Sequence, residues 1–240
     1  MCGRFTLVTN SEEFEATFKL PLVEPIASRF NIAPTQPIAL LTNISGNRQN
    51  IMARWGLIPG WCKNPDDFPL LINARSETAA QKSSFKRAMR HRRALIPASG
   101  FYEWRRPPSG KGQSQAFYVR PRSGGLVGMA ALWETWMGPD GTEIDTAAIM
   151  TTEANQTFMP IHHRLPEVIN PENFSTWLDV IKHKPRHVQP MLGPPDEDFW
   201  EAVPVGDAVN KVANTSPDIQ ERVEERPIES PTEIKQMDLF

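Results

Sequence analysis

Apolar residues in this chain gather in short runs rich in β-branched, aromatic and aliphatic side chains, and glycine-rich or acidic turns separate the runs. Short apolar runs bounded by turn residues predict strands. Six of them stand out, at residues 37–41, 51–57, 93–97, 116–119, 127–133 and 146–152. The sequence shows neither an internal repeat nor the alternation of strand and helix that is typical of a parallel sheet. The pattern therefore predicts an α+β fold with mainly antiparallel strands.

Two helices are predicted in the first half of the chain. Asn10 and Glu13 form a capping-box pattern, and Phe14 and Phe18 follow at the i, i+4 spacing of one helix face. A second helix is expected between residues 83 and 92. Helices are therefore expected to be few and peripheral.

A third helix is predicted near residue 170, where Asn170 provides an N-cap and Pro171 suits the first helical position. Its apolar face is expected to consist of Phe174, Trp177, Leu178 and Ile181. The chain contains 23 prolines, and their scattered positions favour many short strands joined by rigid turns.

The composition changes near Pro217. From there to its end the chain is charged, interrupted by prolines and poor in residues that bury. Such a composition favours a flexible segment. We therefore expect one catalytic domain over residues 1–216, mature from Cys2, and a flexible tail over residues 217–240.

With 240 residues, 40% of them hydrophobic, the chain can bury a substantial core without metal or disulfide support. No stretch approaches the roughly 18 apolar residues of a membrane span, and the N-terminus lacks the order of a secretory signal. We expect a cytoplasmic protein. Cys2 and Cys62 are then reduced thiols, of which Cys62 is interpreted as a packed side chain.

The formal net charge of −2 argues against nucleic-acid binding, but the charge is unevenly distributed. The final fifth of the chain is acidic. Cations crowd a short central span that contains Lys86, Arg87, Arg90, Arg92, Arg93, Arg105 and Arg106. Two interpretations stay open for this span, a patch that binds phosphates and an ordinary solvated helix face.

The chain opens with the residues MCGRF. Removal of Met1 would give Cys2 a free α-amine beside its thiol, with reference pKa values of about 7.7–8.0 and about 8.5. This pair can condense with an aldehyde, because the amine forms a Schiff base and the thiol then closes a five-membered thiazolidine. A second interpretation is that Cys2 is an ordinary second residue.

Seven segments resemble, in order, the SRAP family of abasic-site processing proteins, first described as SOS-response-associated peptidases. They are MCGRF at the start, NIAPTQ at 31–36, WGLIPGW at 55–61, INARSET at 72–78, IPASGFYEW at 96–104, IHHRLP at 161–166 and VNKVANTSPD at 209–218. The resemblance covers roughly residues 2–215. It implies a barrel-like core with a few peripheral helices.

The resemblance implies four catalytic residues. Cys2 matches the crosslinking nucleophile, and Asn73 matches an amide that orients the α-amine or the sugar hydroxyls. Glu103 matches a glutamate that moves protons, and its aromatic neighbours favour a raised pKa. His162 matches a histidine that assists proton transfer, while His163 occupies a variable position of the motif.

The resemblance also implies contacts with single-stranded DNA that carries an abasic site. They are assigned to Arg4, Pro34, Trp61, Arg75, Trp104 and Arg164, with arginines on phosphates and Trp61 stacked on a base. Some members of the family have a second aromatic residue directly after this tryptophan, where Cys62 stands here. Phe68 is a candidate substitute. The Schiff base also predicts a side reaction, strand cleavage by β-elimination.

The last five residues, QMDLF, resemble the peptide by which bacterial replication and repair proteins bind the sliding clamp. Gln236 would offer hydrogen bonds, and Leu239 and Phe240 would fill an apolar pocket. The sequence therefore predicts the clamp as a further partner.

Three other functions remain open. Class II glutamine amidotransferases also begin with Met-Cys-Gly and use an N-terminal cysteine, and a peptidase activity of Cys2 would fit the nucleophile. A binding module for single-stranded DNA with an idle Cys2 is the third. Beyond the adjacent His162 and His163 the sequence shows no paired metal-ligand spacing, so no metal or cofactor is expected. A monomer is expected.

Overall fold

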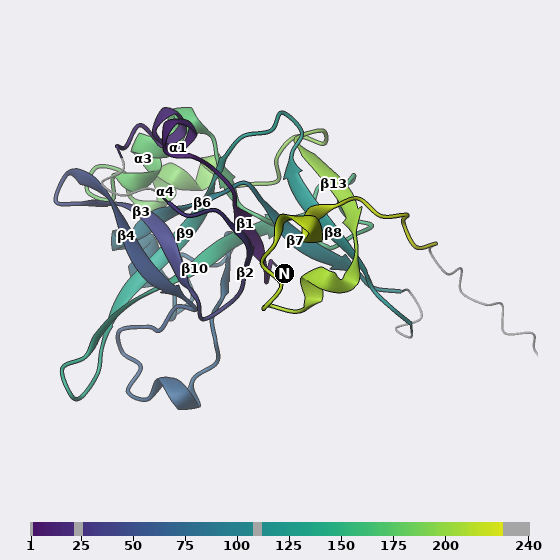
Figure 1. Ribbon diagram of the computed structural model, residues 1–240. Coiled ribbons are helices and arrows are strands. Elements are labelled where there is room, and N and C mark those ends of the chain that lie inside the picture. Colours follow the sequence, from purple (N-terminus) through teal and green to yellow (C-terminus); the bar gives the residue numbers. More distant parts are fainter. Residues whose placement is uncertain (1, 22–25, 108–111, 228–240) are drawn as a thin grey trace, which may run out of the picture.

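The computed structural model describes residues 2–21, 26–107 and 112–227. Two β-sheets lie beside each other, and short helices cover their outer faces (Figure 1). Nearly all strand pairs are antiparallel, so the predicted α+β class with mainly antiparallel strands is confirmed. Among the described residues, no helix is long and apolar enough to cross a membrane.

The larger sheet closes into a five-stranded barrel, because its strands pair in the order β10-β4-β3-β6-β9 and β9 pairs again with β10. The strands are β3 (Pro37–Ile44), β4 (Asn47–Trp55), β6 (Arg93–Ala98), β9 (Val127–Met137) and β10 (Glu143–Glu153). They contain five of the six predicted strand runs, except for the two residues that follow Trp55, and the sixth run, at residues 116–119, lies in the smaller sheet. Three short strands extend the barrel: β5 (Asn73–Arg75), β11 (Arg164–Pro166) and β12 (Val168–Ile169).

Strand β6, most of β9 and the second half of β10 read as apolar runs because they are buried on both faces, whereas β4 is largely half-buried or exposed. In β6, Ala94 and Ile96 belong to one hydrophobic cluster and Leu95 to another, and all six residues of the strand are buried. Two tryptophans have no exposed surface, Trp55 in the first of these clusters and Trp177 in the second. Each indole N–H has a carbonyl acceptor, because Trp55 donates to the carbonyl of Ile72 at 2.9 Å and Trp177 donates to that of Ala94 at 2.8 Å.

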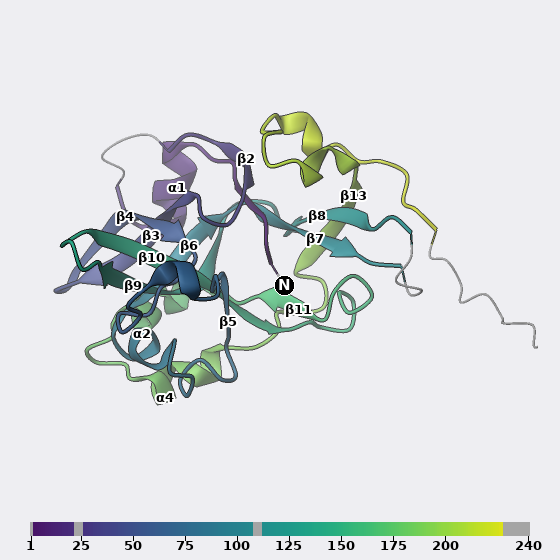
Figure 2. The same cartoon turned by 90° about the horizontal axis from the view of Figure 1, so that it is seen from below.

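The smaller sheet has the order β13-β8-β7-β1-β2 and is antiparallel throughout. Its strands are β1 (Phe5–Leu7), β2 (Arg29–Ile32), β7 (Gly100–Arg105), β8 (Gln115–Pro121) and β13 (Trp200–Val205). Phe5 of β1 lies opposite Phe101 of β7 and opposite Ile32 of β2. This register places the start of the chain beside β7, between the two sheets (Figure 2).

Helix α1 (Ser11–Phe18) begins where the capping pattern predicts. The Asn10 side chain accepts the N–H of Glu13 at 2.9 Å, which satisfies one of the free donors at the helix start. The Glu13 carboxylate accepts a hydrogen bond from Thr9 at 2.8 Å. Phe14 and Phe18 are buried, with ring centroids 4.9 Å apart, as their spacing predicts.

The third predicted helix is shorter than expected. A 3-10 turn (Pro171–Asn173) leads into α3 (Phe174–Leu178), which ends at Asp179. The Asp179 carboxylate accepts the N–H groups of Ile181 and Lys182 and so competes with continuation of the helix. The prediction of Ile181 on the buried face is therefore wrong, since this residue is 70% exposed.

Two further short helices, α2 (Lys86–His91) and α4 (Pro185–Val188), lie next to each other on the outside of the barrel (Figure 2). Helix α2 falls within the predicted range, and α4 was not predicted. The remaining one-turn elements are η1 (Pro65–Asp67), η3 (Gln189–Met191), η4 (Asp207–Asn210) and η5 (Pro217–Gln220).

The packed chain continues past the expected domain boundary at residue 216. Ile219 of η5 is buried, and the guanidinium of Arg226 donates to the Asp207 carboxylate at 2.6 Å. These anchors hold residues 217–227 on the smaller sheet, so the tail does not begin at Pro217 as predicted. The clamp-like residues Gln236, Leu239 and Phe240 lie outside the described residues.

Candidate active site and nucleic-acid interface

Cys2 lies directly before β1 and is buried, with 1% of its surface exposed. Its backbone carbonyl accepts a hydrogen bond of 2.8 Å from the side-chain amide of Asn73. Asn73 opens β5, which pairs in parallel with β10 at Ile149. The barrel therefore holds the amide that fixes the backbone of Cys2, and the two residues meet although 71 positions separate them.

Glu103 and His162 form a second pair in the same site. Glu103 lies on β7, is 3% exposed, and its Oε1 lies 3.3 Å from Nε2 of His162. The Nδ1 atom of His162 accepts the backbone N–H of Arg164 at 3.0 Å. The same Nδ1 atom lies 3.2 Å from the carbonyl oxygen of Arg164, so this ring nitrogen has a backbone partner in either tautomer, and Nε2 faces the carboxyl group.

Burial shifts the pKa values of three ionisable groups in the site. Burial raises the pKa of the Cys2 thiol, and the charge of Glu103 raises it further. Burial also raises the pKa of Glu103 and lowers that of His162 to about 4. Because the charge of Glu103 acts on Cys2, the carboxyl group, the imidazole and the thiol share one electrostatic environment. The four predicted catalytic residues thus come together, as two contacting pairs joined by this coupling.

Arg4 and Trp104 form one edge of the site. The Arg4 Nη1 donates to the Asn31 side-chain oxygen at 2.7 Å and to the carbonyl of Val209 at 2.9 Å. The guanidinium of Arg4 lies 6.0 Å from the ring centroid of Trp104. The Trp104 indole donates to the side chain of Asn210 at 2.8 Å. Both predicted DNA contacts therefore face the segment after β13.

The NIAPTQ segment places Pro34 in a half-buried turn between β2 and β3. Thr35 follows with a φ of 72° and donates its N–H to the carbonyl of Trp55 at 2.8 Å. Asn31 is a positioning residue that the sequence did not identify. Its buried amide binds Arg4 on one side and the carbonyls of Lys211 and Asn214 on the other.

The two remaining predicted arginines differ in their surroundings. Arg75 is exposed at the end of β5. The Arg164 side chain is 7% exposed and makes a bidentate pair with Glu77, both contacts being 2.9 Å long. It also donates to the carbonyl of Thr151. Glu77 was not predicted as a partner, although it belongs to the INARSET segment. Phosphate binding by Arg164 stays a prediction, and it requires this pair to open.

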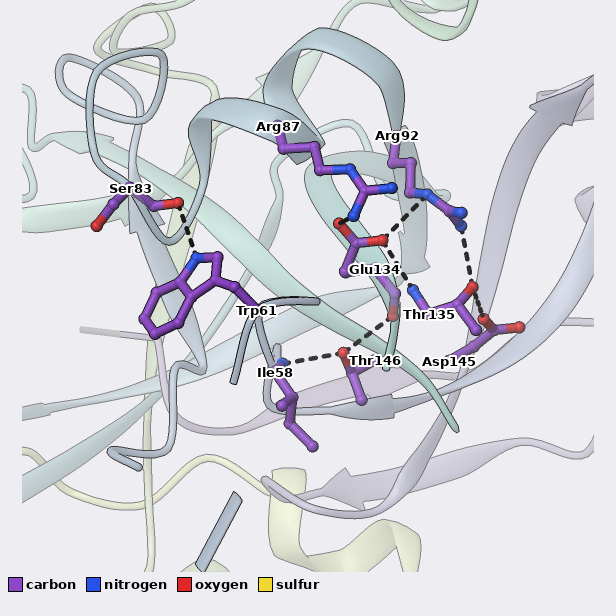
Figure 3. Close-up of polar contacts among 9 residues, drawn as sticks. All are labelled: Ile58, Trp61, Ser83, Arg87, Arg92, Glu134, Thr135, Asp145 and Thr146. Carbon is purple, nitrogen blue, oxygen red and sulfur yellow. Dashed lines mark hydrogen bonds and ion pairs between the residues drawn. The ribbon is translucent and has the colours of Figure 1, made fainter. Parts of the chain in front are cut away.

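Trp61 is 57% exposed on the loop after β4. Phe68 packs edge-to-face against it, with ring centroids 5.4 Å apart at 86°. The indole N–H lies 3.4 Å from the carbonyl of Ser83 (Figure 3). Cys62 is buried beside this pair, and its thiol lies 3.4 Å from the carbonyl of Asn64. The structure therefore presents a two-ring platform in which the Trp61 ring is exposed and the partly buried Phe68 is the second aromatic residue.

His163 is exposed and stacks on His162, with ring centroids 4.3 Å apart. Among the described residues, no group of three or more His, Cys, Asp or Glu side chains is arranged to hold a metal ion. The groups that the site presents are a thiol, a carboxyl group and an imidazole.

Comparison with known proteins gives a consistent result. The model of the family described as SOS response associated peptidase (SRAP) matches residues 1–212. The chain is 36% identical over 225 residues to the abasic site processing protein YoqW of Bacillus subtilis, covering 92% of this chain and 99% of that protein. It is 34% identical to the abasic site processing protein YedK of Escherichia coli, covering 74% of this chain and 79% of that protein.

A more distant relative is the abasic site processing protein HMCES of Gallus gallus, which is 29% identical over 195 residues, with 72% of this chain and 57% of that protein covered. A solved structure of a protein from Bacteroides thetaiotaomicron has the same fold, with a TM-score of 0.80 at 23% identity, covering 93% of this chain and 100% of that chain.

Proposed function

This chain belongs to the SRAP family, and on that premise we propose that it processes abasic sites in DNA by covalent capture at Cys2. Relatives that match most of the chain are named abasic site processing proteins. The observation that carries the proposal is the convergence of Cys2, Asn73, Glu103 and His162 in one buried site. Residues of the barrel and of the smaller sheet both contribute to this site.

The first chemical step needs the α-amine of Cys2, which removal of Met1 exposes. The amine attacks the aldehyde carbon of the ring-opened abasic sugar and gives a carbinolamine. Loss of water then forms the imine. Glu103, whose pKa is raised by burial, donates the proton that the departing hydroxyl needs. His162, whose pKa of about 4 keeps the imidazole neutral near pH 7, accepts at Nε2 the proton that the amine nitrogen loses, in the tautomer that carries its hydrogen on Nδ1.

The second step closes the ring. The sulfur of Cys2 adds to the imine carbon, the electron pair of the C=N bond moves to nitrogen, and the thiol proton ends on that nitrogen. The product is a five-membered thiazolidine, and one water is lost overall. Asn73 holds the carbonyl of Cys2 and so limits rotation of the residue that must present both nucleophiles. If ring closure is slow, the imine allows β-elimination and cleavage of the strand.

The DNA strand is bound by cations and flat apolar surfaces around this site. Arg75 is exposed and meets a phosphate without rearrangement, and Arg4 lies beside the Trp104 ring. Trp61 and Phe68 offer the surface on which an unpaired base stacks. Pro34 shapes the neighbouring turn. Arg164 reaches a phosphate when Glu77 releases it.

A denaturing gel of the protein with single-stranded DNA that contains one abasic site tests the proposal. We expect a covalent adduct that forms without added reductant and is absent with intact DNA. Cys2→Ala and Cys2→Ser keep an N-terminal amine but cannot form the thiazolidine. Their adducts are therefore expected only when borohydride traps the imine, together with more strand cleavage.

Met1 removal is verified by the mass of the intact protein before the reaction. Absence of an adduct from protein whose mass lacks Met1 would falsify the capture mechanism. A stable adduct of undiminished yield with Cys2→Ala would do so as well, because another nucleophile would then be responsible.

A further inference from the structure

His162 lies on a loop that leaves the barrel and returns to it. Strand β10 ends at Glu153, β11 begins at Arg164, and residues 154–163 join the two strands. The loop extends toward the smaller sheet, which carries Glu103 on β7 (Figure 2). The 3.3 Å contact between His162 and Glu103 therefore joins a loop of the barrel to a strand of the other sheet, and its length depends on how the loop is held.

The loop contains a helical turn that ends at His162. The backbone carbonyl of Asn155 accepts the N–H of Met159 at 3.0 Å, and that of Phe158 accepts the N–H of His162 at 3.2 Å. The side-chain oxygen of Asn155 also accepts the N–H of Phe158 at 3.0 Å. The backbone of His162 is therefore built on a turn that Asn155 begins.

Asn155 also binds this turn to the segment that precedes β13. Its side chain is buried, and the amide nitrogen donates to the carbonyls of Pro195 and Asp196 at 3.3 and 3.1 Å. An amide can make both kinds of contact because it carries an acceptor and two donors. The oxygen of Asn155 is thus used within the turn, and its nitrogen is used across the gap to the smaller sheet.

Glu197 binds the same turn from the solvent side. One oxygen of its carboxylate accepts the N–H of Gln156 at 3.1 Å, and the other accepts that of Thr157 at 2.8 Å. The first N–H groups of a helical turn have no partner within the turn, so the carboxylate satisfies donors that the turn leaves over. These hydrogen bonds, that of Thr157 most of all, lower the pKa of Glu197.

An aromatic contact links the turn to the strand that carries Glu103. Phe158 is buried, and its ring centroid lies 5.9 Å from that of Phe101 on β7. Phe101 also packs edge-to-face against Trp200, the first residue of β13, with ring centroids 5.2 Å apart. Because Phe101 and Glu103 are two positions apart on one strand, they lie on the same face of β7. The turn, the start of β13 and β7 therefore pack together around the His162–Glu103 pair.

We propose that Asn155 and Glu197 are positioning residues that fix the turn so that Nε2 of His162 faces Glu103. Asn155 binds carbonyls of the neighbouring segment, and Glu197 binds N–H groups of the turn, so the two side chains hold different parts of it. A looser turn would lengthen the contact between the imidazole and the carboxyl group, and proton transfer in the site depends on that geometry. The proposal rests on the proposed function for the part that His162 plays in proton transfer.

The test compares Glu197→Ala, Glu197→Gln and Asn155→Ala, each alone and each combined with His162→Gln. The rate of adduct formation is measured with saturating single-stranded DNA that contains one abasic site, and the half-saturating DNA concentration is measured separately. Asp179→Ala is the matched control. The Asp179 carboxylate also accepts two backbone N–H groups, but it does so at the end of α3.

With His162 present, we expect Glu197→Ala and Asn155→Ala to slow adduct formation by roughly tenfold at an unchanged half-saturating concentration. Glu197→Gln keeps one acceptor oxygen and should show a smaller loss. In the His162→Gln background the same changes should alter the rate by less than about twofold, because a residue that acts through His162 has nothing left to position.

Equal losses in the two backgrounds, no loss from Glu197→Ala, or an equal loss from Asp179→Ala would each overturn the proposal. Glu197 is exposed, so its variants are expected to fold, and they decide the outcome if Asn155→Ala does not fold.

A second readout does not depend on crosslinking. The side-chain NMR signals of His162, assigned by their absence from His162→Gln, are titrated in the protein without DNA. Burial lowers the pKa of His162 to about 4 in the parent, and a looser turn admits water to the imidazole. Glu197→Ala should therefore raise this pKa toward its ordinary value of 6.5, whereas Asp179→Ala should leave it unchanged.

An unchanged pKa of His162 in Glu197→Ala would contradict the positioning role. If the parent protein forms no adduct at all, the proposed function fails, and the titration still decides whether Asn155 and Glu197 position His162.

Discussion

The Cys2 site and the outer face of helices α2 and α4 use ionisable residues in opposite ways. In the Cys2 site the thiol, the carboxyl group and the imidazole are buried, and burial shifts the pKa of each toward its neutral form. On the outer face of α2 and α4, lysines and arginines such as Lys86, Arg90 and Arg186 are exposed to water. Neutral groups suit proton transfer during condensation of an amine with an aldehyde, and charged groups suit phosphates.

The comparison also distinguishes arginines that hold the backbone in place from cations that are exposed to a ligand. Arg164 and Arg93 have the same charge as the surface cations, yet both are buried and hold backbone carbonyls or a carboxylate. These contacts position β11 and the segment before α4, and Arg164 becomes available to a phosphate only when its pair with Glu77 opens. The environment of an arginine, more than its presence in a motif, therefore decides its contribution.

The largest effect is expected in the buried site. Glu103→Gln removes the acid without a change of size, and we expect crosslinking to slow by about 10²-fold or more. In the parent protein the rate rises with pH as the α-amine loses its proton, and falls as Glu103 ionises. Because the variant lacks the second ionisation, its rate should only rise. The exposed neighbour His163 is the control, and His163→Gln should react at the parent rate in quench-flow or gel time courses.

A smaller effect is expected for the exposed platform. Trp61→Ala should weaken binding of single-stranded DNA by about 1–3 kcal/mol with little change in melting temperature, since the side chain is more than half exposed. Trp136 lies in the cluster beneath the platform, is buried, and donates to the carbonyl of Cys62 at 2.7 Å. Trp136→Ala should instead destabilise the fold by about 3–5 kcal/mol. Similar melting temperatures for the two variants would contradict this distinction.

Glu167 tests how burial affects the pKa of a carboxyl group that takes no part in the proposed reaction. It has no exposed surface, and one carboxyl oxygen accepts the N–H of Gly193 at 2.9 Å. Burial raises the pKa of Glu167 to about 7. The stability contributed by its neutral form is therefore complete below the ordinary pKa of about 4.5 and is lost as pH rises through about 7.

Glu167→Gln should remove this dependence. Between pH 5 and pH 8 the melting temperature of the parent should fall relative to that of the variant, by about 2–4 °C for each kcal/mol of ionisation cost. Parallel melting curves across this pH range would show that Glu167 is ionised in the folded protein at neutral pH.

The smallest effect on the reaction is expected at the C-terminus. We propose that QMDLF binds a bacterial sliding clamp, and deletion of residues 236–240 should abolish that binding in a pull-down or by surface plasmon resonance. Crosslinking to abasic DNA should stay unchanged, because the described contacts of the site come from residues before 216. Retained clamp binding after the deletion would exclude the peptide.

Sequence patterns predicted the barrel strands β6, β9 and β10 well because most of their residues are buried on both faces and form apolar runs. The short strands β5 and β11 were missed, since three residues such as Asn73–Arg75 carry no periodic signal and form a strand only beside β10. The end of α3 was missed because the Asp179 side chain competes for backbone donors. These are tertiary or local hydrogen-bond effects that hydrophobic patterning does not record.

The site residues were identified from ordered motifs and not from spacing. Cys2, Asn73, Glu103 and His162 come from different parts of the chain, and only the fold brings them together. The partners that the motifs did not reveal, Glu77 for Arg164 and Asn31 for Arg4, are polar residues whose role depends on a contact across the fold.

The most direct test of capture by the Cys2 aminothiol is mass spectrometry of the crosslinked protein after nuclease and trypsin digestion. We predict that the sugar remnant is attached to the peptide of residues 2–4, that the peptide begins at Cys2, and that its mass shows the loss of one water. Its thiol should no longer react with iodoacetamide, because the sulfur is bonded in the thiazolidine. A remnant on another peptide, a peptide that retains Met1, or a thiol that still alkylates would contradict this mechanism.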